Sequence, residues 1–251
     1  MAGEDRDRRP LLVTKRHPRS PVSEAFRTLR TNLSYTSPDQ PLRSLLFTSA
    51  GPEEGKSTVA ANLAVVLAQA GSRVLVVDAD LRKPVMHKAF KLENRRGLTN
   101  ALVEDLDFAE LVRSTDLPGL FVLTSGPIPP NPAELLGSAR MQRLLPALAA
   151  AYDLVLVDTP PVLAVTDAAV LAPLVDGAIL VARAGVTRTD LLKEAKEALE
   201  RTGVRLLGAV LNGLRPDTEG YYYYHYRYYY GDGAGRRTDR GEGTEGAGEE
   251  L

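Results

Sequence analysis

A glycine-rich stretch with one lysine and several hydroxyls carries the clearest chemistry in the chain: Ser49-Ala50-Gly51-Pro52-Glu53-Glu54-Gly55-Lys56-Ser57-Thr58. A turn of this kind between a strand and a helix points successive backbone N–H groups at a phosphate, and the helix dipole reinforces them. The lysine reaches the terminal phosphates, and the serine hydroxyl suits Mg²⁺. We therefore predict a nucleoside triphosphate site formed by Gly51, Glu53, Glu54, Gly55, Lys56, Ser57 and Thr58.

Three aspartates at the ends of apolar runs are the candidate partners of this loop. Asp78 and Asp80 follow the run 74–77, and Asp158 follows the run 154–157. A phosphate site needs one carboxylate to hold Mg²⁺ and often another to orient or deprotonate the nucleophile. Asp158 fits the metal side. Asp80 alone could simply cap the next element. The pair of Asp78 and Asp80 at one strand end, however, favours a role in the phosphate site.

These residues need a sheet whose strands end at one edge. Apolar runs at 45–47, 73–77, 120–124, 154–157, 177–181 and 205–211 alternate with helical patterns. The alternation predicts an α/β fold with a doubly wound, mostly parallel sheet and right-handed crossovers. In such sheets ligands bind at the carboxyl ends of the strands. The sequence therefore predicts that the acids and the glycine-rich loop meet there, as in a P-loop NTPase.

Composition sets the outer limits. The chain has 251 residues, a net charge of −1 and no cysteine. A charge so near zero gives no global field for nucleic acid or membrane, and the missing thiols exclude disulfides and thiolate metal sites. No apolar stretch is long enough to span a bilayer. We predict a flexible arm over 1–19, a nucleotide-binding domain over 20–214 and a disordered tail over 215–251.

Two further patterns lie outside the nucleotide motifs. A helix is predicted from Pro21, with Ser20 as its N-cap, and it carries Glu24, Arg27 and Arg30 away from its apolar face. Spacing alone makes these charges a solvated surface. The tail holds eight of the ten tyrosines of the chain: Tyr221, Tyr222, Tyr223, Tyr224, Tyr226, Tyr228, Tyr229 and Tyr230.

Together these motifs resemble those of the bacterial tyrosine kinases (BY-kinases), P-loop proteins linked to capsule and exopolysaccharide synthesis. The three nucleotide motifs of that family match at 50–57, 75–82 and 155–160. Its Glu-x-x-Arg-x-x-Arg oligomerisation motif matches at Glu24, Arg27 and Arg30, which reverses the interpretation of that stripe as a solvated face. Its C-terminal tyrosine cluster matches at 221–230. The resemblance covers about residues 20–230.

The resemblance implies a role for each matching residue. Lys56 and Ser57 would bind phosphate and Mg²⁺ with ATP, and Asp80 and Asp158 would help to hold the metal. Asp78 would assist deprotonation of the incoming tyrosine, and Arg82 would support the site; the division of roles between Asp78 and Asp80 stays open. The tail tyrosines would be phosphorylated by a neighbouring subunit of a ring. By its position in this fold Asn212 is an adenine contact, although a turn role fits it equally well.

The resemblance also implies partners: protein tyrosine substrates and a separate membrane activator that recruits a cytoplasmic chain to the inner face of the plasma membrane. Two rival functions remain. The first is an ATPase switch of the MinD/ParA type, which usually has a second lysine five positions before the main one, where this chain has Gly51. The second is a non-enzymatic adaptor that binds through its tyrosine tail.

Overall fold

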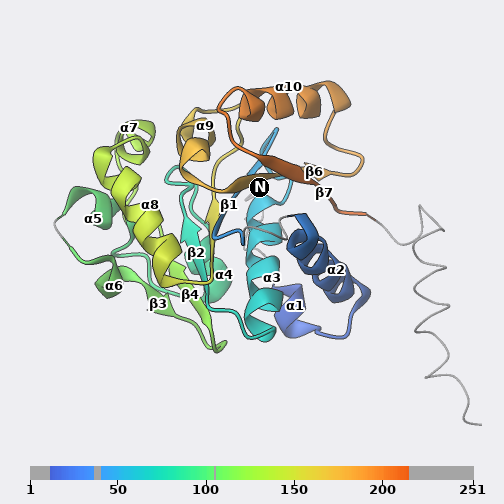
Figure 1. The fold of residues 1–251 in the computed structure, drawn as a ribbon, viewed down its shortest axis with the longest axis horizontal. Helices are drawn as coiled ribbons and strands as arrows, with labels where there is room; N and C mark the ends of the chain where they lie inside the picture. The colour runs from blue at the N-terminus through green and yellow to red at the C-terminus, as the bar shows by residue number, and fades with distance from the viewer. Residues whose placement is uncertain (1–11, 37–40, 105, 215–251) are drawn as a thin grey trace, which may run out of the picture. The chain divides into compact units, whose positions relative to one another are not determined.

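A sheet with helices on both faces forms the part of the chain that the computed structural model describes, which is residues 12–36, 41–104 and 106–214 (Figure 1). Within those residues the sheet has seven strands in the order β3-β4-β2-β5-β1-β6-β7. Their bounds are β1 Ser44–Ser49, β2 Val74–Asp78, β3 Arg113–Ser114, β4 Leu120–Leu123, β5 Leu154–Asp158, β6 Gly177–Arg183 and β7 Leu206–Asn212.

The predicted doubly wound, mostly parallel sheet is confirmed. Neighbouring strands from β4 to β7 pair in parallel, and only the two-residue edge strand β3 is antiparallel. The apolar runs of the sequence became the central strands because parallel strands are covered on both faces and so need apolar side chains throughout. The edge strand β3 consists of two exposed polar residues, which explains why no apolar run marked it.

Side chains of the parallel strands alternate between two hydrophobic cores. In β1, Leu46 packs in one core, and Leu45 and Phe47 pack in the other; in β2, Leu75 and Val76 divide in the same way. This period of two is what an extended chain imposes. The sheet therefore has a complete apolar layer on each face.

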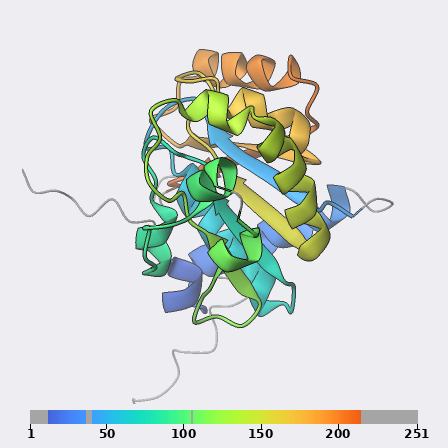
Figure 2. The ribbon, with the colours of Figure 1, turned by 90° about the vertical axis from the view of Figure 1, so that its left-hand side faces the viewer.

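Two sets of helices cover these layers (Figure 1, Figure 2). One core includes Leu12, just before α1, and side chains from α2, α3 and α4, and the other includes side chains from α5 to α10. Figure 2 looks onto the side where α5, α6, α7 and α8 lie. The bounds are α1 Val13–Arg16, α2 Pro21–Thr36, α3 Lys56–Gln69, α4 Met86–Phe90, α5 Leu98–Val103, α6 Phe108–Leu111, α7 Pro132–Leu136, α8 Ala139–Ala151, α9 Asp167–Leu171 and α10 Thr189–Glu200, with a 3₁₀ turn at Ala172–Leu174.

The described start of the chain corrects the expectation of a flexible arm. Residues 13–16 form α1, and both Leu12 and Thr14 are buried. The Thr14 hydroxyl donates to Asn62 Oδ1 of α3 at 2.9 Å, and the Thr14 backbone N–H donates to the same oxygen at 3.0 Å. A buried polar pair and one leucine thus hold residues 12–19 to the domain. The sequence lacked a signal because one turn of helix has no periodicity.

The charged stripe on α2 is partly occupied within the chain. Arg27 pairs with Glu24 at 2.8 Å, and Arg30 donates to the backbone oxygen of Val66 in α3 at 3.1 Å. The helix begins at Pro21 as predicted, and the Ser20 hydroxyl accepts from the Ser23 backbone N–H at 3.2 Å. Among the described residues no helix is both long and apolar enough to cross a membrane. Residues 1–11 and the tyrosines at 221–230 lie outside the described residues.

Candidate nucleotide and phosphoryl-transfer site

The carboxyl ends of three adjacent strands bring the predicted residues together. Strands β2, β5 and β1 are neighbours, and Asp158 at the end of β5 is in register with both Asp78 of β2 and Phe47 of β1. The glycine-rich loop leaves β1 and enters α3 at Lys56. Lys56, Ser57, Asp78, Asp80 and Asp158 therefore share one edge of the sheet, as the sequence predicts.

The backbone of the loop depends on one glycine more than on the other. Gly55 has φ of 97°, a left-handed conformation that favours glycine, and a Cβ there would lie 2.0 Å from Asn212 Nδ2. Gly51 has no positive φ, and a Cβ there would meet only the Glu54 carboxylate, at 3.5 Å. Glu53 is the other left-handed residue of the loop, with φ of 62°. Gly55 is thus fixed by shape, whereas Gly51 is not.

Three side chains, which we call the clasp, hold this loop: Arg183 at the end of β6, Thr187 in the turn after β6, and Asn212 at the end of β7. Of these three, only Asn212 was predicted from the sequence as a site residue. The Glu54 carboxylate is buried; it accepts from the Ala50 backbone N–H at 3.0 Å and from the Thr187 hydroxyl at 2.6 Å. Asn212 Nδ2 donates to the Glu54 backbone oxygen at 3.0 Å, and Arg183 donates to that of Glu53 at 3.1 Å.

The clasp changes what two of the predicted residues do. The Glu54 side chain faces the protein, so its contribution to a nucleotide site is through the backbone. Asn212, predicted as a possible adenine contact or a turn residue, touches the loop directly in this structure. No local signal marked Arg183 or Thr187, because their importance arises only where β6 passes beside β1.

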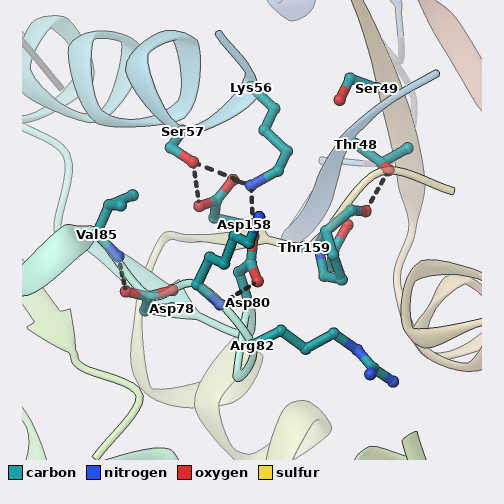
Figure 3. Close-up of polar contacts among 12 residues, drawn as sticks. Thr48, Ser49, Lys56, Ser57, Asp78, Asp80, Arg82, Val85, Asp158 and Thr159 are labelled. Atoms are coloured by element: carbon teal, nitrogen blue, oxygen red, sulfur yellow. Dashed lines mark hydrogen bonds and ion pairs between the residues drawn. The ribbon is translucent and has the colours of Figure 1, made fainter. Parts of the chain in front are cut away.

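Lys56 lies between the loop and the acids (Figure 3). Its Nζ is 2.9 Å from Asp80 Oδ2, 3.5 Å from Asp158 Oδ1 and 3.1 Å from Ser57 Oγ. The Ser57 hydroxyl donates to Asp158 Oδ2 at 2.6 Å. One cation is thus shared by two carboxylates, and the site carries excess negative charge that a bound cation would relieve.

Burial and crowding shift the pKa values at this site. Burial, reinforced by the charge of Asp158, raises the pKa of Asp78 to about 8. Burial also raises the pKa of Asp158 to about 6, although Lys56 and the Ser57 hydroxyl oppose it. Burial alone would lower the pKa of Lys56, but the carboxylates of Asp158 and Asp80 outweigh it and raise that pKa. Lys56 is therefore charged at neutral pH, and Asp78 is largely protonated.

Asp78 and Asp80 are held by the loop that follows them. Asp78 Oδ2 accepts from the backbone N–H groups of Val85 and Met86 at 3.1 and 2.9 Å, while its fully buried Oδ1 has no hydrogen-bond partner. Asp80 Oδ1 accepts from the Lys83 backbone N–H at 3.0 Å. Lys56 has a direct contact with Asp80 and none with Asp78. The two acids thus differ: Asp80 faces the lysine, and Asp78 keeps one free oxygen.

Arg82 points away from Lys56 (Figure 3). Its guanidinium makes two 2.9 Å hydrogen bonds to Asp167, a fully buried carboxylate at the start of α9. Such a planar pair is strong and directional. Arg82 therefore ties the loop after β2 to α9, and Asp167 is a further site residue that sequence reasoning missed.

The residues present fit a magnesium ion that is bound together with nucleotide. No group of three or more acidic, histidine or cysteine side chains within the described ranges could hold a metal alone. However, Ser57 Oγ and Asp158 are in contact, and the buried Asp158 Oδ1 accepts no hydrogen bond. Mg²⁺ usually takes one or two protein oxygens and completes its shell with phosphate and water. Asp80, predicted as a third ligand, is engaged by Lys56 in this structure.

Comparison with known proteins agrees with this geometry. The AAA domain family model matches residues 53–181. The tyrosine-protein kinase YwqD of Bacillus subtilis is 50% identical over 214 residues, which cover 84% of this chain and 90% of YwqD. The putative tyrosine-protein kinase CapB of Staphylococcus aureus is 39% identical, with 85% of this chain and 93% of CapB covered.

Solved structures give the same result. The kinase domain of the Escherichia coli tyrosine kinase ETK superposes with a TM-score of 0.80 at 38% identity, covering 83% of this chain and 82% of that domain. MinD of Pyrococcus horikoshii, solved with Mg-ADP, has a TM-score of 0.59 at 24% identity and covers 67% of this chain and 69% of MinD, which shows a shared fold alone. From its site geometry and these relatives, the chain belongs to the bacterial tyrosine-protein kinase family, built on a P-loop domain.

Proposed function

We propose that this chain transfers the γ-phosphoryl group of ATP to tyrosine hydroxyls of its own C-terminal cluster, between subunits of a ring. The observation that carries the proposal is the position of Lys56 between the glycine-rich loop and the two carboxylates of Asp80 and Asp158. In this arrangement the cation that would neutralise the phosphates lies beside the acids that would hold Mg²⁺.

The proposed chemistry is an in-line exchange of bonds. The P–O bond to the leaving ADP breaks, the bond from phosphorus to the tyrosine oxygen forms, and the ionised fraction of Asp78 takes the phenolic proton. When bound, Mg²⁺ supplies charge neutralisation at the phosphates, held by Ser57 and Asp158. Asp78 Oδ1 is free of hydrogen bonds, which suits an acceptor, and a raised pKa gives it affinity for the proton.

The wider role would be control of exopolysaccharide or capsule synthesis with a membrane activator. Relatives support two chain lengths: this chain spans 90% of YwqD but only 28% of the putative tyrosine-protein kinase EpsB of Ralstonia nicotianae. We propose that a separate membrane protein activates this chain. Glu24, Arg27 and Arg30 would form the ring contact after leaving their present partners.

The test is direct mapping of transferred phosphate. Full-length protein is incubated with ATP and Mg²⁺, and phosphate is located by mass spectrometry. Phosphotyrosine within 221–230 that disappears in Lys56→Met is the expected result. ATP hydrolysis without phosphotyrosine would instead support the MinD/ParA-type switch, and neither reaction would leave the adaptor. Mixing Lys56→Met protein with a chain whose tail tyrosines are phenylalanine tests transfer between subunits, since only transfer in trans then labels the Lys56→Met tail.

A further inference from the structure

The segment that follows the second nucleotide motif is strongly basic, and the proposed chemistry does not use its charges. Between residues 82 and 96 there are six lysines and arginines and a single acid, Glu93. All six of these basic residues are exposed. We call residues 82–96 the basic segment. Basic side chains at this density repel each other, and this repulsion destabilises the segment unless an anion binds there.

Both ends of the basic segment are fixed beside the site. At its start, the backbone N–H of Lys83 is bonded to Asp80, and those of Val85 and Met86 are bonded to Asp78. At its end, Asn94 exchanges hydrogen bonds with Ser125 and Gly126, just past β4. The segment therefore begins and ends at the carboxyl edge of the sheet, and its start lies next to Asp78, the acid that is proposed to receive the tyrosine proton. Between these ends, α4 packs in the core on one face of the sheet.

Half of its charges have no counter-ion within the described part of the chain. Arg82 pairs with Asp167, Arg95 approaches Glu93, and Arg96 pairs with Glu104. In contrast, Lys83, Lys88 and Lys91 form no ion pair with any described residue. The one acid that Lys91 influences, Asp116, is already bonded to Lys15. Three exposed cations thus remain available in the basic segment, and Lys83 is the one next to Asp80.

The sequence of the proposed acceptor has matching charge. Asp217 and Glu219 lie four and two positions before Tyr221, and Asp232 lies two positions after Tyr230. The phosphates of a nucleotide are already served by the glycine-rich loop and Lys56. We propose that Lys83, Lys88 and Lys91 form an acceptor-recognition surface that binds acidic residues on the N-terminal side of a substrate tyrosine. This inference rests on the proposed kinase function and adds the substrate class: tyrosines preceded by acidic residues.

The test uses a synthetic peptide of residues 216–226 as acceptor and a second peptide with Asp217→Asn and Glu219→Gln. The enzyme is the full chain, either wild type or with Lys83→Gln, Lys88→Gln and Lys91→Gln. The matched control carries Lys193→Gln, Lys196→Gln and Arg201→Gln, which remove the same charge on and just after α10. Phosphate on the peptide is measured separately from phosphate on the chain, and KM values are compared with kcat.

We expect the three substitutions in the basic segment to raise the KM for the acidic peptide about tenfold, because exposed ion pairs contribute modestly and are summed. The KM for ATP and kcat should not change. Wild type should have a KM for the neutral peptide that is as high as the KM of the variant for the acidic peptide, and the variant should show no further rise. Added salt should weaken the preference of wild type for the acidic peptide and leave the variant unchanged. The α10 control should match wild type.

Equal KM values of wild type and variant for the acidic peptide would overturn the proposal, and so would an equal rise for both peptides. Fluorescence anisotropy of the labelled peptides provides a reading that needs no transfer. If no phosphotyrosine forms, the kinase proposal fails, while tighter binding of the acidic peptide by wild type still supports the surface and equal binding rejects it.

Discussion

The glycine-rich loop and the acids that face it are held in place by different physics. Backbone conformation and hydrogen bonds from β6 and β7 hold the loop, through Gly55, Glu54 and Asn212. The acidic side is governed instead by the burial of carboxylates. Burial raises the pKa values of Asp78 and Asp158, and Arg82 neutralises the buried Asp167. The loop is thus fixed in shape before ligand binds, while the acidic side has unrelieved repulsion that a bound cation would remove.

The largest effect on stability is expected when a buried carboxylate loses its cationic partner. Arg82→Gln should lower the free energy of unfolding by about 3 kcal/mol, because it leaves the fully buried Asp167 unpaired. Asp167→Asn should lower it by only about 1 kcal/mol, because the partly exposed Arg82 can be solvated by water. Urea denaturation of both variants and of the double variant measures the asymmetry. Equal losses from the two single variants would refute it.

A smaller effect is expected from the shape of the loop. Gly55→Ala should cost about 2 kcal/mol, since alanine is strained at φ of 97° and its Cβ would overlap Asn212 Nδ2. Asn212→Ala alone should cost about 1 kcal/mol for its lost hydrogen bond to Glu54. In the Gly55→Ala background, however, Asn212→Ala should recover part of the lost stability and of the binding of a fluorescent ATP analogue, because it removes the overlap although the strain at φ of 97° remains. Simple additivity of the two losses would show that the contact does not govern the loop.

The smallest effect per step is a slope of stability with pH, which for one group is at most about 1.4 kcal/mol per pH unit. Asp78 has a pKa of about 8 in the folded chain and 3.8 in its ordinary state, so between these values the unfolded chain has lost a proton that the folded chain keeps. Stability without nucleotide should therefore fall as pH rises from about 4 to 8. Asp78→Asn removes the ionisation and should flatten the fall, whereas Glu197→Gln on the exposed face of α10 should not. Melting temperatures at pH 5, 6.5 and 8 provide the measurement, and parallel curves for wild type and Asp78→Asn would contradict the assignment of the slope to Asp78.

Most of the sheet could be predicted because its signals are local. Each buried parallel strand appears in the sequence as a short apolar run. An Asp directly after such a run indicates the carboxyl edge of the sheet, where ligands bind. The short helices between residues 85 and 112 leave a weaker signal, since α4, α5 and α6 have four to six residues each and show little periodicity. The edge strand β3 left no signal, because it consists of only two residues and both are polar and exposed.

The sequence by itself determined the residues that can bind a nucleotide, because glycine, lysine and serine of the loop are contiguous and their backbone geometry is local. It also determined that Asp78 and Asp158 end strands of the sheet and that Asp80 follows Asp78 by two positions. Only the tertiary structure decided the partners of these residues: Thr187 contacts Glu54 from 133 positions away, and Asp167 contacts Arg82 from 85 positions away. Strand order sets such contacts, and strand order depends on the packing of the whole sheet.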